Sequence, residues 1–471
     1  MSQAAALPNS SPAKVFTFYA LSVIGAIGGF VLICRYGQGL TAAAPAAGAA
    51  EATLKAAQDH ALFHVLTALV AVIVAGRLIG WLFKHIGQPA VIGEVVAGIL
   101  LGPSLLGWLY PDAYAALLPP SVAPHLGVIA QIAVILYMFL VGLEFDAAML
   151  QKKGHVAVAI SHASIITPFL LGGGLALWLY PRLSTSDVPF DVFALFLGVS
   201  MSVTAFPVLA RILTDRGMTK TPLGVVALTC AAADDVTAWC LLAFVVAVAQ
   251  AQVSSVFGIF ALSLAYMATM FFVVRPILSR VAHSRYFGEL NQGVLAVIFV
   301  ALLVSALTTE WIGVHAIFGA FVLGAIVPHD SVIARELPDK LQNIIAVLFL
   351  PAFFAFTGMR TRIGLVSGME AWLICGVIVL IATLGKFGGT LTAARVTGLG
   401  WRDSAALGAL MNTRGLMELI VLNIGLDLGV ISEKLFAMLV IMALVTTLST
   451  TPTLHYIMGR DLTKEPQPST I

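Results

Sequence analysis

The stretch PLGVVALTCAAADDVTAWCLLAFVVAV, residues 222–248, contains two adjacent aspartates, Asp234 and Asp235, and no other charged residue. It is long enough to cross a bilayer as an α-helix, which needs about 20 apolar residues. Carboxyl groups near the middle of a bilayer are costly, and where they occur they usually mark a pathway for protons or ions. The stretch therefore predicts a membrane helix with an ion or proton site near its centre.

The composition of the whole chain agrees with a membrane protein. Of the 471 residues, 60% are hydrophobic and 10% are charged, against roughly 25% charged in soluble domains, and the mean hydropathy is +1.00. The net charge is +2 and the basic residues are scattered, so we expect no nucleic-acid partner. The four cysteines lack metal-ligand spacing and no cofactor motif is present, so we expect no cofactor and no enzymatic activity.

Cutting the chain at polar, glycine and proline clusters gives fourteen apolar segments, which predict an all-α, polytopic membrane protein. The first is an N-terminal helix and the others form a body of thirteen helices. The predicted segments are 15–34, 60–84, 88–107, 125–144, 156–180, 190–213, 222–249, 254–278, 290–308, 312–328, 341–359, 371–394, 403–425 and 432–455.

The loop charges predict an orientation. With the C-terminus in the cytoplasm, sixteen Lys and Arg residues fall on the cytoplasmic side and six on the other, as the positive-inside rule requires. We expect residues 1–59 to form an apolar segment, either an extra helix or a signal peptide, with an external linker. Residues 60–455 form the transmembrane domain and residues 456–471 a short cytoplasmic tail. The expected location is the cell (inner) membrane.

Two segments contain residues that interrupt a helix. Pro207 removes an amide donor within 190–213, and the segment 403–425 has an interruption from Asn412 to Gly415. Broken helices in corresponding places are typical of transporters built from inverted repeats. Each break lies in the fifth helix of a group of six, which predicts one repeat over about 60–249, a second over about 290–455, and a linker helix at about 254–278.

Three more charges remain inside apolar segments. Lys386 lies in the sequence LGKFGG, residues 384–389, and an ammonium group there needs a carboxylate partner. Arg414 and Glu418 lie four residues apart, so on a helix they would share a face. They form either a local ion pair or part of the functional core.

Several motifs resemble those of the monovalent cation:proton antiporter-2 family, which includes plant cation/proton exchangers, Kef-type potassium systems and bacterial sodium/proton antiporters. They run in order through the chain: QPAVIGE (88–94), LGPS (101–104), FLVGLE (139–144), TAFPVLAR (204–211), Asp234-Asp235, Gly385-Lys386 and MNTRGLMELIVLN (411–423). The resemblance implies a sodium/proton antiporter-like fold of thirteen core helices in two inverted repeats. It also implies a homodimer in which a core domain moves against a dimerisation domain.

The resemblance also implies site residues. Asp235 matches the carboxylate that binds the cation or a proton, Asp234 the residue that pairs with Lys386, and Thr204 a position beside the cation. Pro207, Asn412, Thr413, Arg414 and Glu418 match the crossing region. Plant-type exchangers commonly have Asn at the position of Asp234, whereas an aspartate pair with a lysine is more typical of electrogenic antiporters.

A mechanism follows from the residues themselves. A proton and a monovalent cation (Na⁺ or K⁺) would compete for the Asp235 carboxylate, and alternating access would carry the neutralised site across the bilayer. An ion channel or an ion-sensing protein of the same fold is the alternative. An intramembrane aspartyl protease is excluded, because adjacent residues on a helix point about 100° apart and cannot share one water.

Overall fold

The computed structural model describes residues 12–38, 40, 61–144, 154–219, 221–250, 256–282 and 290–459, and its regular elements there are helices. Their bounds, in chain order, are α1 (Pro12–Gly37), α2 (Ala61–His85), α3 (Ala90–Leu101), α4 (Leu106–Leu109), α5 (Pro111–Leu117), α6 (Ala123–Glu144), α8 (Gly154–Leu183), α9 (Phe190–Ser202), α10 (Phe206–Asp215), α11 (Pro222–Gln250), α12 (Val256–Thr269), α13 (Arg275–Ala282), α14 (Gln292–Ile312), α15 (Ala316–Ile326), α16 (Val332–Ile344), α17 (Leu350–Arg360), α18 (Gly368–Val396), α19 (Trp401–Met411), α20 (Leu416–Asp427) and α21 (Glu433–Met458).

The predicted all-helical membrane fold is confirmed. Within the described residues, twelve helices are long and apolar enough to span a membrane, and the bent pair α19 and α20 makes a thirteenth span. The short apolar helix α15 corresponds to the remaining predicted segment. Helices dominate because a bilayer offers no water to the backbone, so each segment must satisfy its own N–H and C=O groups.

Two boundaries differ from the sequence prediction. The segment predicted at 88–107 is helical only to Leu101, because Gly102 and Pro103 end α3, and α4 follows after a turn. The helix predicted to begin at 341 begins at Val332, where the Ser331 hydroxyl caps its first turn by accepting from the N–H of Ala334 at 3.2 Å. A polar amphipathic turn therefore extends this helix beyond its apolar part.

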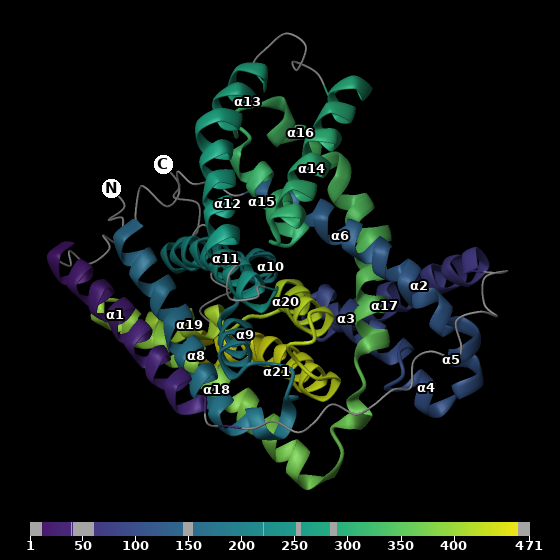
Figure 1. Cartoon of the computed structure of the whole chain (residues 1–471), viewed down its shortest axis with the longest axis horizontal. Helices are drawn as coiled ribbons and strands as arrows, with labels where there is room; N and C mark the ends of the chain where they lie inside the picture. The colour runs from purple at the N-terminus through teal and green to yellow at the C-terminus, as the bar shows by residue number, and fades with distance from the viewer. Residues whose placement is uncertain are drawn as a thin grey trace, which may run out of the picture.

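The helices form two bundles, visible in Figure 1. One, here called the scaffold, contains α2, α3, α6, α14, α15 and α17. The other, here called the core, contains α8, α9, α10, α11, α18, α19, α20 and α21. In the core α8 packs against α18, α9 and α11, and α1 lies along α8, with the Phe30 and Phe169 rings 5.2 Å apart.

Contacts within the scaffold are reciprocal between the two predicted repeats. The second helix of the first repeat, α3, packs on the third helix of the second, α17, while α6 packs on α15 in the converse pairing. Both pairs approach through glycines: a Cβ on Gly98 would lie 2.2 Å from the Phe354 carbonyl oxygen, and one on Gly142 would lie 2.3 Å from that of Phe321. Close packing through small residues is typical of membrane helices.

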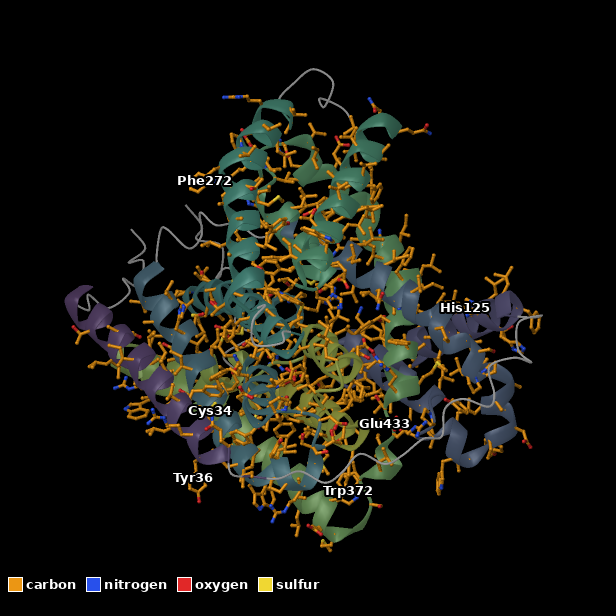
Figure 2. All side chains as sticks on the ribbon, viewed as in Figure 1. Cys34, Tyr36, His125, Phe272, Trp372 and Glu433 are labelled. Atoms are coloured by element: carbon orange, nitrogen blue, oxygen red, sulfur yellow. The ribbon has the colours of Figure 1, made fainter. Side chains whose placement is uncertain are left out.

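The side chains in Figure 2 indicate where the helix ends lie. Tyr36, Trp372 and Glu433, near the end of α1 and the beginnings of α18 and α21, all lie in the lower part of the view. We call this the Glu433 end of the molecule. The opposite, C-terminal end holds the last turns of α2, α10 and α21, where an Nη atom of Arg216 donates to the carbonyl of Thr451 at 3.3 Å.

Candidate functional site

The two helix breaks cross each other inside the core. Helix α9 ends at Ser202 and α10 begins at Phe206, while α19 ends at Met411 and α20 begins at Leu416 with a bend of 45°. The N–H of Ala205 donates to the carbonyl of Thr413 at 2.9 Å, so a backbone group of each break has its hydrogen-bond partner in the other break. Such non-helical backbone is tolerated at membrane depth only where protein or water surrounds it.

Asp234, in the middle of α11, is fully buried and saturated with donors. Its Oδ1 accepts from Ser161 at 2.6 Å, and its Oδ2 accepts from Ser164 and Thr204, each at 2.7 Å. The Nζ atom of Lys386 lies 2.9 Å from Oδ2. A carboxylate with four donors is stabilised as an anion, and the lysine balances its charge.

Lys386 reaches this pair because α18 and α8 pack closely. A Cβ on Gly385 would lie 2.8 Å from the Cα of Pro168, and one on Gly389 would lie 2.6 Å from the hydroxyl of Thr167. Larger side chains at these glycines would push α18 away from α8. The ammonium group, itself fully buried, also lies 3.4 Å from the Ser164 hydroxyl.

Asp235, the next residue on α11, differs from Asp234 in its hydrogen bonding. It is 3% exposed, and neither carboxylate oxygen has a hydrogen-bond partner within the described part of the chain. The backbone amide of Phe206, at the positive end of α10, faces the carboxylate, and a helix N-terminus favours negative charge. A buried carboxylate that has no side-chain donor among the described residues is costly to keep as an anion, so this site is suited to bind a proton or a cation.

Thr204 lies in the first break, and its hydroxyl donates to Asp234 at 2.7 Å rather than to Asp235. The same oxygen lies 3.2 Å from the carbonyl of Met411 in the second break. Thr204 thus connects Asp234 to both crossing segments. Pro207 is the second residue of α10, where a helix has no acceptor for the amide that proline lacks.

Arg414 lies in the second break, before α20 begins, and not on a helix as its spacing from Glu418 suggested. Its Nη1 donates to Glu418 at 3.0 Å and to the Ser200 carbonyl at 2.7 Å, and its Nη2 donates to the Met201 carbonyl at 2.6 Å. Those carbonyls belong to the last turn of α9, where helices have free acceptors and a negative dipole end. The guanidinium therefore forms an ion pair and also caps α9.

We expect Arg414→Met to lower the free energy of unfolding by about 3–5 kcal/mol, because Glu418 would become an unpaired buried charge. If Arg414 also caps α9, adding Glu418→Met should recover only part of that loss. Thermal unfolding in detergent measures the stability of both variants. The exposed Arg335→Met is the matched control and should change stability by less than about 0.5 kcal/mol. Full recovery in the double variant would mean that Arg414 serves the ion pair alone.

Asn412 and Thr413 occupy the rest of the second break. The Asn412 side chain is 4% exposed and its Oδ1 lacks a partner among the described residues. The Thr413 hydroxyl lies 3.5 Å from that of Thr450 on α21. Thr447, also on α21, accepts from the N–H of Arg414 at 2.9 Å and donates to its carbonyl at 2.8 Å.

Three members of this site were not predicted from the sequence: Ser161, Ser164 and Thr447. The two serines lie three residues apart on α8, a spacing that places both on one helix face, and this was the available signal. Thr447 has no comparable signal, because threonine is common in membrane helices.

Residues 68–458 match the family of transmembrane sodium/hydrogen exchangers. The chain belongs to this family. The fold agrees: the sodium proton antiporter MjNhaP1 from Methanocaldococcus jannaschii superposes with a TM-score of 0.63, covering 86% of this chain and 100% of that one at 12% identity.

Sequence relatives include proteins of both prokaryotes and eukaryotes. The chain is 44% identical over 401 residues to the Na⁺/H⁺ antiporter NhaS4 of Synechocystis, covering 83% of this chain and 97% of that protein. It is 38% identical to the cation/H⁺ antiporter 17 of Arabidopsis thaliana, covering 86% of this chain and 50% of the relative. For the K⁺/H⁺ antiporter 1 of Saccharomyces cerevisiae the identity is 36%, with 79% and 43% covered. The chain thus spans half or less of the plant and yeast relatives.

Proposed function

We propose that this protein exchanges a monovalent cation, Na⁺ or K⁺, for protons by alternating access, with both ions competing for Asp235. Its family membership and its antiporter relatives support the class of activity. The assignment of Asp235 as the ion-binding residue rests on the contrast between the two adjacent aspartates. Asp234 has four donors, whereas the buried oxygens of Asp235 have no partner among the described residues.

The charge balance explains the coupling. With Asp234 neutralised by Lys386 at 2.9 Å, the uncompensated charge of an empty site is that of Asp235. Moving this anion through a low-dielectric barrier is unfavourable, whereas a bound proton or a bound cation neutralises it. The site therefore moves between the two sides of the membrane only when a proton or a cation is bound. Carrying one ion in each direction exchanges the cation for protons. Oxygen ligands suit a hard monovalent cation.

The two bundles provide the moving parts. We infer that the core carries Asp235 against the scaffold, and that the scaffold forms the interface of a homodimer. Orientation follows from the loop charges: the C-terminal end faces the cytoplasm and the Glu433 end faces outside, in a cell (inner) membrane. Asp234, Lys386 and the crossing residues position the breaks, and Thr204 contributes oxygen beside the site.

The experiment is transport by purified protein in proteoliposomes with an imposed pH gradient, comparing Na⁺, K⁺ and Li⁺. We expect saturable cation uptake driven by the proton gradient. If one proton exchanged for one cation at Asp235 alone, no net charge would move. Because Asp234 is acidic and Lys386 can exchange a second proton as its partner comes and goes, we expect two protons to move against one cation. With Na⁺ as the tested ion, such electrogenic exchange responds to a valinomycin-clamped potential by about 2.3 kcal/mol per charge per 100 mV. Flux without saturation or proton coupling would favour a channel. Rates indifferent to the potential would mean electroneutral exchange.

A further inference from the structure

Two buried polar atoms without partners among the described residues belong to side chains that line one cavity between core and scaffold. In the described residues, neither Nε1 of Trp239 nor Nδ1 of His315 has a hydrogen-bond partner. Trp239 lies on α11 of the core, and His315 precedes α15 of the scaffold. Both side chains line one cavity, whose other walls are apolar. Buried polar atoms are rarely left unsatisfied, and when they are, a water or an ion is the usual explanation.

The cavity has the size for one water molecule. It leaves about 10 Å³ for the centre of a water, close to the minimum that a single molecule requires. A buried water also needs at least two polar partners. The indole N–H is a donor only, whereas the imidazole nitrogen either donates or accepts, so one water satisfies both atoms.

The position of this cavity connects it with Asp235. Trp239 lies four residues after Asp235 on the same helix, so the two side chains share a face of α11. His315 also lines a second cavity, with about 30 Å³ for water centres, which includes Gln131, Asn423 and Asp427. Asp427 ends α20 near the Glu433 end, and its side chain is 42% exposed. The two cavities share His315 in their walls, and their other lining residues include the exposed Asp427 and Trp239, which lies one helical turn from Asp235.

Two carboxylates, Glu310 and Asp427, lie near His315. Glu310 of α14 accepts from the N–H of Ala316 at 2.8 Å, next to the histidine in the chain. Asp427 of α20 lines the second cavity together with His315 and is paired with Arg360 of α17. Gln131 of α6 and Trp239 of α11 are the polar neighbours from the remaining helices. A histidine near two carboxylates and beside a cavity of the size of one water is well placed to pass protons.

We propose that His315 and Trp239 hold a water between scaffold and core, and that His315 relays protons between the Glu433 end and Asp235. Trp239 positions the water. A proton leaves imidazolium Nδ1 for the water, a proton passes on through water to the Asp235 carboxylate, and a proton from the Asp427 side restores the imidazolium. This proposal rests on the proposed function, because it assumes that Asp235 is the proton acceptor.

The transport test uses His315→Gln, which keeps a hydrogen-bonding group but cannot cycle a proton. In vesicles with the protein in one orientation, we expect at least a tenfold lower maximal rate when the pH step is applied at the Glu433 end, an unchanged KM for the cation, and loss of the wild-type pH profile. Trp239→Phe should give a smaller loss of the same kind. The exposed His125→Gln, at the edge of the molecule in Figure 2, is the matched control and should behave as wild type. A wild-type rate and pH profile in His315→Gln would overturn the proposal.

The water itself is tested without transport. In protein labelled with ¹⁵N-tryptophan, Trp239→Phe identifies the indole signal of Trp239. We expect His315→Leu to shift that signal and to speed its exchange with solvent deuterium, whereas His125→Gln should leave it unchanged. An unmoved signal in folded His315→Leu protein would contradict the water bridge. If Asp235→Asn retained exchange while the signal moved, the proposed function would fail and the bridge would stand.

Discussion

Asp235→Asn is expected to abolish coupled exchange while the protein remains folded in the membrane. An amide has nearly the shape of the carboxylate, but it cannot cycle between protonated and ionised forms. The variant therefore loses the neutralisation by which either a proton or a cation loads the site. We expect no proton-driven uptake of Na⁺ or K⁺ above the rate of empty liposomes.

The stability of this variant separates a functional role from a structural one. Neither oxygen of Asp235 has a hydrogen-bond partner in the part of the chain that the structure describes, so the substitution breaks no side-chain hydrogen bond there and should leave the unfolding temperature unchanged or raise it. Asp403→Asn, on the exposed first turn of α19, is the control and should exchange as wild type. Exchange at the wild-type rate in Asp235→Asn would remove this residue from the mechanism.

The second large effect concerns the pair of Asp234 and Lys386. Both side chains are fully buried and lie 2.9 Å apart. Removing one partner leaves an uncompensated charge, which costs about 3–5 kcal/mol. We therefore expect Asp234→Asn and Lys386→Met each to lower the unfolding temperature markedly, with Lys386→Met leaving the carboxylate to three hydroxyl donors.

The double variant tests whether the two charges act together. With both removed no buried charge is left unpaired, so we expect the double variant to recover part of the loss. Ser161→Ala and Ser164→Ala are useful comparisons, because each removes one hydrogen bond to Asp234 and should cost about 1.5–3 kcal/mol. Additive losses for Asp234 and Lys386 would contradict a direct interaction.

Much of the fold could be predicted from the sequence because bilayer thickness sets helix length. Segments such as 222–249 and 371–394 differ from the observed helices by a few residues, since apolar runs of this length have few alternatives in a membrane. Both breaks were also predicted, because Pro207 and the run from Asn412 to Gly415 interrupt a helix by local chemistry.

The partners across helices could not be predicted in the same way. Ser161 and Ser164 reach Asp234 because α8 packs on α11, and the register of that packing depends on the whole core. Arg414 caps α9 by donating to the carbonyls of Ser200 and Met201, which precede it in the chain by 214 and 213 positions. No local sequence pattern specifies such a contact. The position of His315 beside Trp239 in one cavity likewise depends on how α11 and α15 are arranged, and no local pattern specifies it.

The most direct test of competition at Asp235 is the dependence of cation KM on pH, measured by tracer uptake of Na⁺ or Rb⁺ into proteoliposomes. If one carboxylate binds either ion, protons compete with the cation. At acidic pH the KM for the cation should then rise about tenfold for each unit by which the pH falls, while the maximal rate at saturating cation stays constant. A maximal rate that falls with pH at an unchanged KM would contradict competition and place the proton on a separate site.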